Sequence, residues 1–197
     1  MSAGMEITMK QTDIINPFQP YMTLEMDGYS QINRTDYGIS HFYEFTIHDE
    51  KKHCIKAVPD ASIDLLFNIG ENKVSTYISG TVFGVKKWEL GTQDDCFGVR
   101  FQPGQGILPK DITMEMIVND DIEIDGDIFG KNLTEKIALA KTMSERIDIF
   151  KKAYEDMVLG RNSLSDKEKI NEYLVNRISR TKGMITMRQL EDETNYS

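Results

Sequence analysis

The hydrophobic period of the chain changes at Pro103. From about Thr8 to Gln102, apolar residues fall in short β-rich segments that turn residues interrupt, which is typical of an all-β sandwich or barrel. After Pro103, apolar residues recur at the spacing of amphipathic helices. The sequence therefore predicts an α+β protein with its strands first and its helices last.

The clearest predicted strand runs from Ile63 to Ile69. Its apolar residues alternate with Asp64, Leu66 and Asn68, which fall on the opposite face because side chains alternate along a strand. Further strands are predicted over residues 37–47, 74–78, 86–90 and 96–101. No helical spacing is found before residue 102, so no helix is predicted there.

Helices are predicted over residues 133–141, 142–160, 165–183 and from 186 onward. The last three begin with a capping box, in which a hydroxyl and a side chain three residues later bind each other's backbone amides. The boxes pair Thr142 with Glu145, Ser165 with Glu168, and Thr186 with Gln189. These signals define where each helix begins.

The predicted helix over residues 142–160 carries one apolar stripe, which consists of Ile147, Phe150, Tyr154 and Met157. Two interpretations of this stripe are open. It can pack on the strands, which is the commoner fate of one amphipathic face, or it can form a dimer contact.

The net charge of −9 argues against a broad basic surface for nucleic acid, because attraction to phosphates supplies most non-specific affinity. Residues 163–197 hold six basic and six acidic residues, so the preceding part carries the whole net charge. The chain has no run of about 18 apolar residues and no signal-peptide pattern at its start, which predicts a cytoplasmic protein without a membrane span. Cys54 and Cys96 stand alone and are expected to be buried free thiols.

Four motifs follow one another in a defined order. They are PDASIDLLFNIG at residues 59–70, a turn at 78–80, GVRFQPGQG at 98–106 and the acidic VNDDIEID at 118–125. The final MITMRQLEDETNYS, residues 184–197, predicts a short helix, a tight turn at Asn195 and an N-cap at Ser197. In this order and spacing, the chain from residue 58 onward resembles the sensor region and the entry to the first helix-turn-helix of AraC-family transcription regulators.

The resemblance implies three parts. Residues 1–130 would form a cupin-like antiparallel β-barrel that binds a small-molecule effector, residues 131–162 a helical linker that dimerises, and residues 163–197 the start of a helix-turn-helix. The recognition helix would follow Tyr196 and Ser197, so the chain is expected to stop before it and to reach promoter DNA only through a further domain. The implied partners are the effector, promoter DNA and a second copy of the chain.

The candidate effector-binding residues come from the strands. Asp64 and Arg100 each lie in an apolar strand on the face opposite their hydrophobic neighbours, where they could bind a polar ligand or each other. The alternative is a partly exposed salt bridge on the outer face. The other candidates, for which core packing is the competing interpretation, are Trp88, Tyr43, Asn68 and Tyr77.

No cofactor, metal ligand or catalytic residue is predicted. Cupin metal sites use an H-x-H pair, whereas His41, His48 and His53 lie seven and five residues apart near predicted turns. The glycine-rich and nucleophile-elbow motifs of nucleotide-binding proteins and hydrolases are also missing. The sequence therefore favours a regulatory sensor over a metal-dependent cupin-type enzyme acting on a small metabolite and over an interaction module without a ligand.

Overall fold

The structure is a computed structural model that describes residues 17–46, 54–71, 73–89, 95–106, 108–109, 111–160 and 165–195. The chain forms two compact units, and the described residues of the first lie between 17 and 160 and those of the second between 165 and 195. The predicted features at His48, His53, Tyr196 and Ser197 lie outside the described residues. No described helix is long and apolar enough to cross a membrane.

The larger unit is built on a six-stranded antiparallel sheet with the strand order β1-β2-β7-β4-β5-β8. Its strands are β1 (Asp27–Asn33), β2 (Ile39–Thr46), β7 (Asp95–Phe101), β4 (Asp64–Ile69), β5 (Val74–Ser79) and β8 (Asp121–Ile124). A second sheet pairs β3 (Cys54–Ala57) with β6 (Lys86–Glu89). The α+β class is therefore confirmed, and the described strands form two sheets with β1 and β8 at the edges of the larger one.

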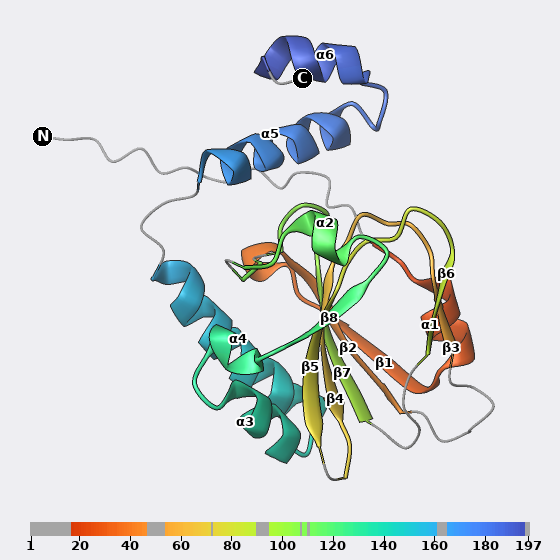
Figure 1. The fold of residues 1–197 in the computed structure, drawn as a ribbon, viewed down its shortest axis with the longest axis vertical. Coiled ribbons are helices and arrows are strands. Elements are labelled where there is room, and N and C mark those ends of the chain that lie inside the picture. The colour runs from red at the N-terminus through yellow and green to blue at the C-terminus, as the bar shows by residue number, and fades with distance from the viewer. Residues whose placement is uncertain are drawn as a thin grey trace, which may run out of the picture. The chain divides into compact units, whose positions relative to one another are not determined.

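Helices cover one side of this sheet. In Figure 1, α3 (Leu133–Leu139) and α4 (Met143–Leu159) lie on one side, and α1 (Pro20–Glu25), β3 and β6 lie on the other. The described residues also form α2 (Met114–Ile117) and the 3-10 turns η1 (Asp36–Gly38) and η3 (Gly126–Phe129). The prediction of no helix before residue 102 is wrong, because α1 begins at Pro20, a residue whose fixed φ suits a first helical position.

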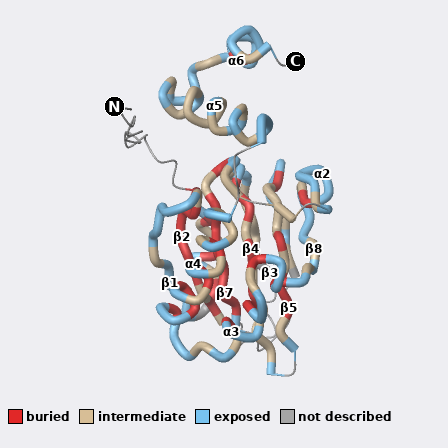
Figure 2. Tube along the Cα trace, turned by 90° about the vertical axis from the view of Figure 1, so that its left-hand side faces the viewer, coloured by how far each residue is buried: buried red, intermediate tan, exposed pale blue. Residues whose placement is uncertain are grey.

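The side of the sheet that α3 and α4 cover, here called the helix face, holds the main core. Phe42, Phe67 and Phe97 come from β2, β4 and β7 and are fully buried. The ring of Phe150 on α4 packs edge-on against Phe42 and Phe67, with centroids 5.9 and 6.3 Å away. Figure 2 shows the buried residues concentrated along these strands.

This packing decides between the two interpretations of the apolar stripe on α4. Ile147, Phe150 and Tyr154 belong to the main core and are 4, 0 and 0% exposed, and Met157 packs against it. The stripe therefore packs on the sheet, and a dimer contact of this helix, which would need another of its faces, stays a prediction.

The second side of the sheet, here called the cavity face, holds a smaller core under α1. Its buried members are Met22, Met26, Tyr43, Phe45 and Cys96. Cys96 is a free thiol with no exposed surface, as the sequence predicts. Because this core is small, it leaves room for a cavity beside it.

The smaller unit consists of α5 (Asp166–Arg180) and α6 (Met187–Thr194). Both predicted capping boxes are formed, as is the third one at Thr142 on α4. Asn195 ends α6 in the left-handed conformation, as expected for a tight turn. The two helices are joined by Glu193, which accepts hydrogen bonds from Tyr173 at 2.7 Å and from Arg177 Nε at 2.8 Å.

Candidate functional site

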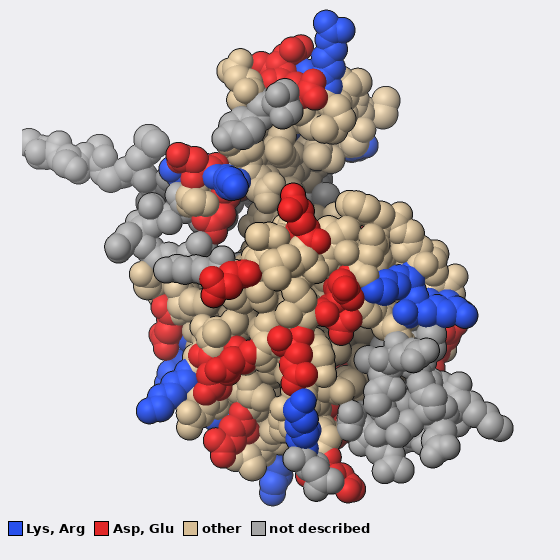
Figure 3. Space-filling model, in the orientation of Figure 1, with Lys and Arg blue, Asp and Glu red and all other residues tan. Residues whose placement is uncertain are grey.

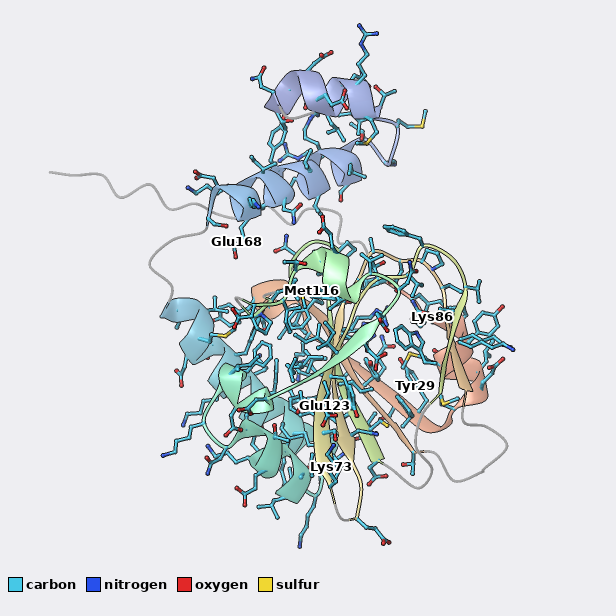
Figure 4. The ribbon with its side chains drawn as sticks, viewed as in Figure 1. Tyr29, Lys73, Lys86, Met116, Glu123 and Glu168 are labelled. Carbon is cyan, nitrogen blue, oxygen red and sulfur yellow. The ribbon has the colours of Figure 1, made fainter. Side chains whose placement is uncertain are left out.

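A cavity of about 190 Å³ opens on the cavity face of the larger sheet. Its wall includes residues of both sheets and of α1. In Figure 4, this region lies between the larger sheet and the β3–β6 pair, near the labelled Tyr29 and Lys86, neither of which lines the cavity. A single water needs about 10–15 Å³ in this measure, and pockets for drug-sized ligands start at about 300 Å³. The cavity therefore suits a ligand of metabolite size.

Charged side chains meet in the cavity wall. Arg100 on β7 binds Asp60 through Nη2 at 2.7 Å and Asp64 on β4 through Nη1 at 3.1 Å. The side chains of these three residues are 5, 11 and 14% exposed. Asp64 and Arg100 are direct partners across β4 and β7, which explains why their side chains point to the same side. The alternative of an exposed outer salt bridge is therefore wrong.

Tyr43 on β2 adds a hydroxyl to this group. Its hydroxyl donates a hydrogen bond to Asp64 Oδ1 at 3.2 Å, and its ring is 3% exposed. The ring can lie there because Gly98 is its partner on β7, and a Cβ on Gly98 would come within 2.0 Å of the Tyr43 Cζ. A glycine in the middle of β7 thus makes room for the tyrosine that contacts Asp64.

The loop before β4 holds the second carboxylate in place. Asp60 Oδ2 accepts a hydrogen bond from Gln19 Nε2 at 2.9 Å, and Oδ1 accepts one from the Ser62 amide at 3.2 Å. Between them, Ala61 adopts a left-handed φ of 60°, a conformation that favours glycine. Gln19, Asp60 and Ser62 line the cavity, and sequence analysis missed all three as site residues.

Burial shifts the pKa values of three side chains near Arg100. Burial raises the pKa of Asp64 from 3.8 to about 6, against the opposing effect of the Arg100 guanidinium, and the charge of Asp60 raises it further. Burial, followed by repulsion from Arg100, lowers the pKa of His41 from 6.5 to about 4. Burial also raises the pKa of Tyr43 well above 10.0. At neutral pH, His41 and Tyr43 are therefore uncharged.

The structure brings all the predicted candidates to one cavity. Besides Asp64, Arg100 and Tyr43, the wall includes Asn68, Tyr77 and Trp88. Asn68 Oδ1 lies 2.9 Å from the Cys96 thiol, which donates to it. Trp88 on β6 carries the Lys86 amino group 3.9 Å from its ring centroid. Side chains from strands far apart in sequence thus line one space.

Two polar atoms near the cavity lack partners. Ser62 Oγ and Arg100 Nε are buried and make no hydrogen bond to any residue that the structure describes. Both side chains line the cavity, and Ser62 is only 2% exposed. Since buried polar groups are nearly always paired, these atoms mark a place where a polar molecule would be accommodated.

His41 follows the η1 turn by three residues, so it lies near a turn as expected, but within a strand. His41 lies inside β2, is 5% exposed and has its Nδ1 3.0 Å from the Ser40 hydroxyl. Within the described ranges, no group of three or more His, Cys, Asp or Glu side chains is placed to hold a metal ion. The chemistry that the described residues offer is hydrogen bonding and ion pairing.

Comparison with known families finds a match in the middle of the chain. Residues 37–123 match a family described as "Domain of unknown function (DUF6597)". This stretch is less than half of the chain, and it includes Asp60, Asp64 and Arg100 but not α3 to α6. No curated protein and no solved structure matches the chain. The matched part thus holds β2 to β7, most of β8 and most of the cavity wall, but not β1 or α1, and the description of this family names no activity.

Proposed function

We propose that this chain is the effector-sensing part of an AraC-type transcription regulator, in which a small polar metabolite binds in the cavity. The observation that carries the proposal is the cavity itself, with an Arg100–Asp60–Asp64 cluster in its wall. A few polar groups that converge in a mostly apolar concave site are typical of small-molecule binding. The order of the sequence motifs links this site to the regulator family.

The position of the cavity supports a cupin-like arrangement of the two sheets. Its wall takes Asn68 and Tyr77 from the six-stranded sheet and Ala57 and Trp88 from the two-stranded sheet. Barrels of this size hold one small ligand between strands of opposite walls. We therefore infer that the two sheets act as the two walls of a cupin-like barrel around the ligand.

The smaller unit would carry the regulatory output. α6 begins with a capping box, is eight residues long and ends in a left-handed Asn195, which are the features expected of the first helix in a helix-turn-helix. The outer surface of the larger unit suits a sensor rather than a DNA reader. Figure 3 shows acidic side chains spread over the part of its surface where β8, α3 and α4 lie in Figure 1, which would repel phosphates.

Ligand binding can be tested with thermal shift against a library of cationic, anionic and neutral metabolites. A ligand at one hundred times its Kd stabilises the folded state by about 2.7 kcal/mol, and that would raise the Tm by roughly 5–10 °C for a domain of this size. The variant that tests whether the ligand binds in the cavity is Ala57→Phe, because a phenyl ring at this position of the wall would occupy part of the cavity.

Its control is Ala140→Phe, a half-buried alanine outside the cavity. We expect the shift to be lost in Ala57→Phe and kept in Ala140→Phe. If no compound of any charge class stabilises the chain, or if Ala57→Phe keeps the full shift, the sensor proposal is wrong.

The regulatory part has separate tests. We expect the natural protein that contains this chain to bind a specific promoter site, and a gel shift without specific binding would contradict the DNA-binding part of the proposal. We also propose that the regulator is a homodimer, through a surface other than the buried stripe of α4. Sedimentation of the chain at micromolar concentration tests this, and a monomer would contradict it.

A further inference from the structure

The charges around the cavity do not balance. Among the residues that the structure describes, the charged side chains of its wall are the acids Asp60, Asp64 and Asp121 and the base Arg100, and the charge of Lys86 acts on Asp121 from outside the wall. The two carboxylates that contact Arg100 already outnumber its single charge. A concave site with low-dielectric walls concentrates this negative potential toward its interior.

The positive charge of Arg100 is already offset by carboxylates. Nη1 and Nη2 each contact one carboxylate, its side chain is 5% exposed, and Nε is the atom of this group that lacks a partner among the described residues, so it can still donate to a neutral acceptor. An anionic ligand that replaced one of these contacts would have to displace Asp60 or Asp64 and then lie beside the displaced carboxylate. That exchange costs the desolvation of a further negative charge without adding a positive one.

The carboxylates, in contrast, retain capacity to accept hydrogen bonds. Each carboxylate offers about four acceptor sites. Asp64 accepts from Tyr43 and Arg100, and Asp60 accepts from Gln19, the Ser62 amide and Arg100. A hydrogen-bond donor with a positive charge would use the remaining sites and offset the excess charge.

The rest of the wall suits the body of such a ligand. Apolar and aromatic side chains complete the cavity, among them Met22, Phe45, Leu66, Val82 and Trp88. Aromatic faces attract organic cations, and Trp88 already holds the Lys86 amino group on its ring. The unpartnered Ser62 hydroxyl supplies a further polar group at the wall.

We propose that the cavity binds a small organic cation, an alkyl- or arylammonium of metabolite size, with its ammonium group on Asp64 and Asp60 and its apolar body against Leu66 and Trp88. This inference rests on the proposed sensor function and adds the charge class of the effector. The ammonium supplies both hydrogen-bond donors and a positive charge for the two carboxylates. An alcohol of the same shape has no charge to offset theirs, and a carboxylate of the same shape adds a further negative charge.

Three probes of nearly the same shape test the charge class: phenethylammonium, phenethyl alcohol and phenylacetate. Binding to the whole chain is measured by titration calorimetry at neutral pH and by thermal shift. We expect phenethylammonium to bind at least tenfold more tightly than the other two. Phenylacetate binding as tightly as phenethylammonium, or no measurable binding of phenethylammonium, would overturn the inference.

Two variants connect the binding to the cavity. Asp64→Asn keeps the shape of the side chain and removes one charge, and we expect it to weaken phenethylammonium binding at least tenfold. Asp121→Asn does the same at an exposed position of the wall, where folding is not at risk, and we expect a smaller loss of a few fold. Asp148→Asn, an exposed aspartate on α4 outside the cavity, is the matched control and should bind as the unchanged chain does.

The outcomes separate this inference from the sensor proposal. Equal affinity in Asp64→Asn, Asp121→Asn and Asp148→Asn would show that the ammonium binds elsewhere and would overturn the inference. Anionic or neutral compounds that stabilise the unchanged chain but not Ala57→Phe would leave the sensor function standing while contradicting the cationic effector.

Discussion

Replacing Arg100 by methionine tests the electrostatics of the cavity most directly. The side chain is 5% exposed and holds two carboxylates at 2.7 and 3.1 Å. Methionine keeps much of the volume but leaves Asp60 and Asp64 facing each other with no positive partner. Breaking a buried ion pair by removing one partner costs about 3–5 kcal/mol. We therefore expect Arg100→Met to lower the free energy of unfolding by this amount near neutral pH.

The loss should depend on pH in a defined direction. The folded pKa of Asp64 is raised to about 6, so the stability it contributes is present below its unfolded pKa of 3.8 and is lost as the pH rises through 6. Arg100 opposes this rise, and without it the pKa of Asp64 climbs further and the loss continues to higher pH. The cost of the substitution should therefore be larger at about pH 8 than at about pH 5.

His41 changes the pH dependence of the Arg100→Met cost in the same direction. Its folded pKa is lowered to about 4, first by burial and then by Arg100, so the stability it contributes is present above 6.5 and is lost as the pH falls toward 4. Without the guanidinium, the pKa of His41 is lowered by a smaller amount. Acidification therefore removes less of the protein's stability. Both groups thus make Arg100→Met less costly in acid.

Urea unfolding at about pH 5 and about pH 8 measures both quantities. The matched control is Arg146→Met, which removes another buried arginine whose partner, Glu44, lies 3.4 Å away and is 29% exposed. We expect the control to cost less and to show little dependence on pH. A cost for Arg100→Met below about 1 kcal/mol, or an equal cost at both pH values, would refute the electrostatic account of this site.

Three further substitutions test the packing by urea unfolding. Gly98→Ala drives a Cβ into the Tyr43 ring and should cost about 1–3 kcal/mol, and an unchanged stability would mean that the ring moves freely. Phe150→Ala should cost about 3–5 kcal/mol because the ring is fully buried between the sheet and α4, and a cost under about 1 kcal/mol would contradict its core position. Ala61→Gly should add about 0.5–1 kcal/mol of stability because it relieves the left-handed φ of 60°, whereas a destabilised variant would contradict that strain.

Local patterns in the sequence predicted much of the fold. The capping boxes at Thr142, Ser165 and Thr186 begin their helices as expected, because a cap depends only on residues three apart. The alternation in residues 63–69 placed Asp64 and Asn68 on the correct face of β4. These signals are contained within a few residues and need no knowledge of the tertiary structure.

Other features depend on distant contacts. Asp60 lies in a loop, and it becomes a site residue only because Gln19 and Arg100, 41 and 40 residues away, bind it. The helix α1 has six residues, too few to show a hydrophobic period. β1 is an edge strand whose half-exposed, polar sequence carries little alternation. Sequence periodicity cannot reveal any of the three.

The pairing of Asp64 with Arg100 also affects which strand register the sheet can adopt. They face each other across β4 and β7, with Leu65 opposite Val99 as the next pair. If β4 slipped by a single residue along β7, side chains that now share a face would be turned to opposite faces. One charge would then enter the layer of phenylalanines without a partner, which is strongly unfavourable. We infer that the ion pair favours one register of β4 along β7. The residues that form the binding cavity therefore also disfavour mispaired strands.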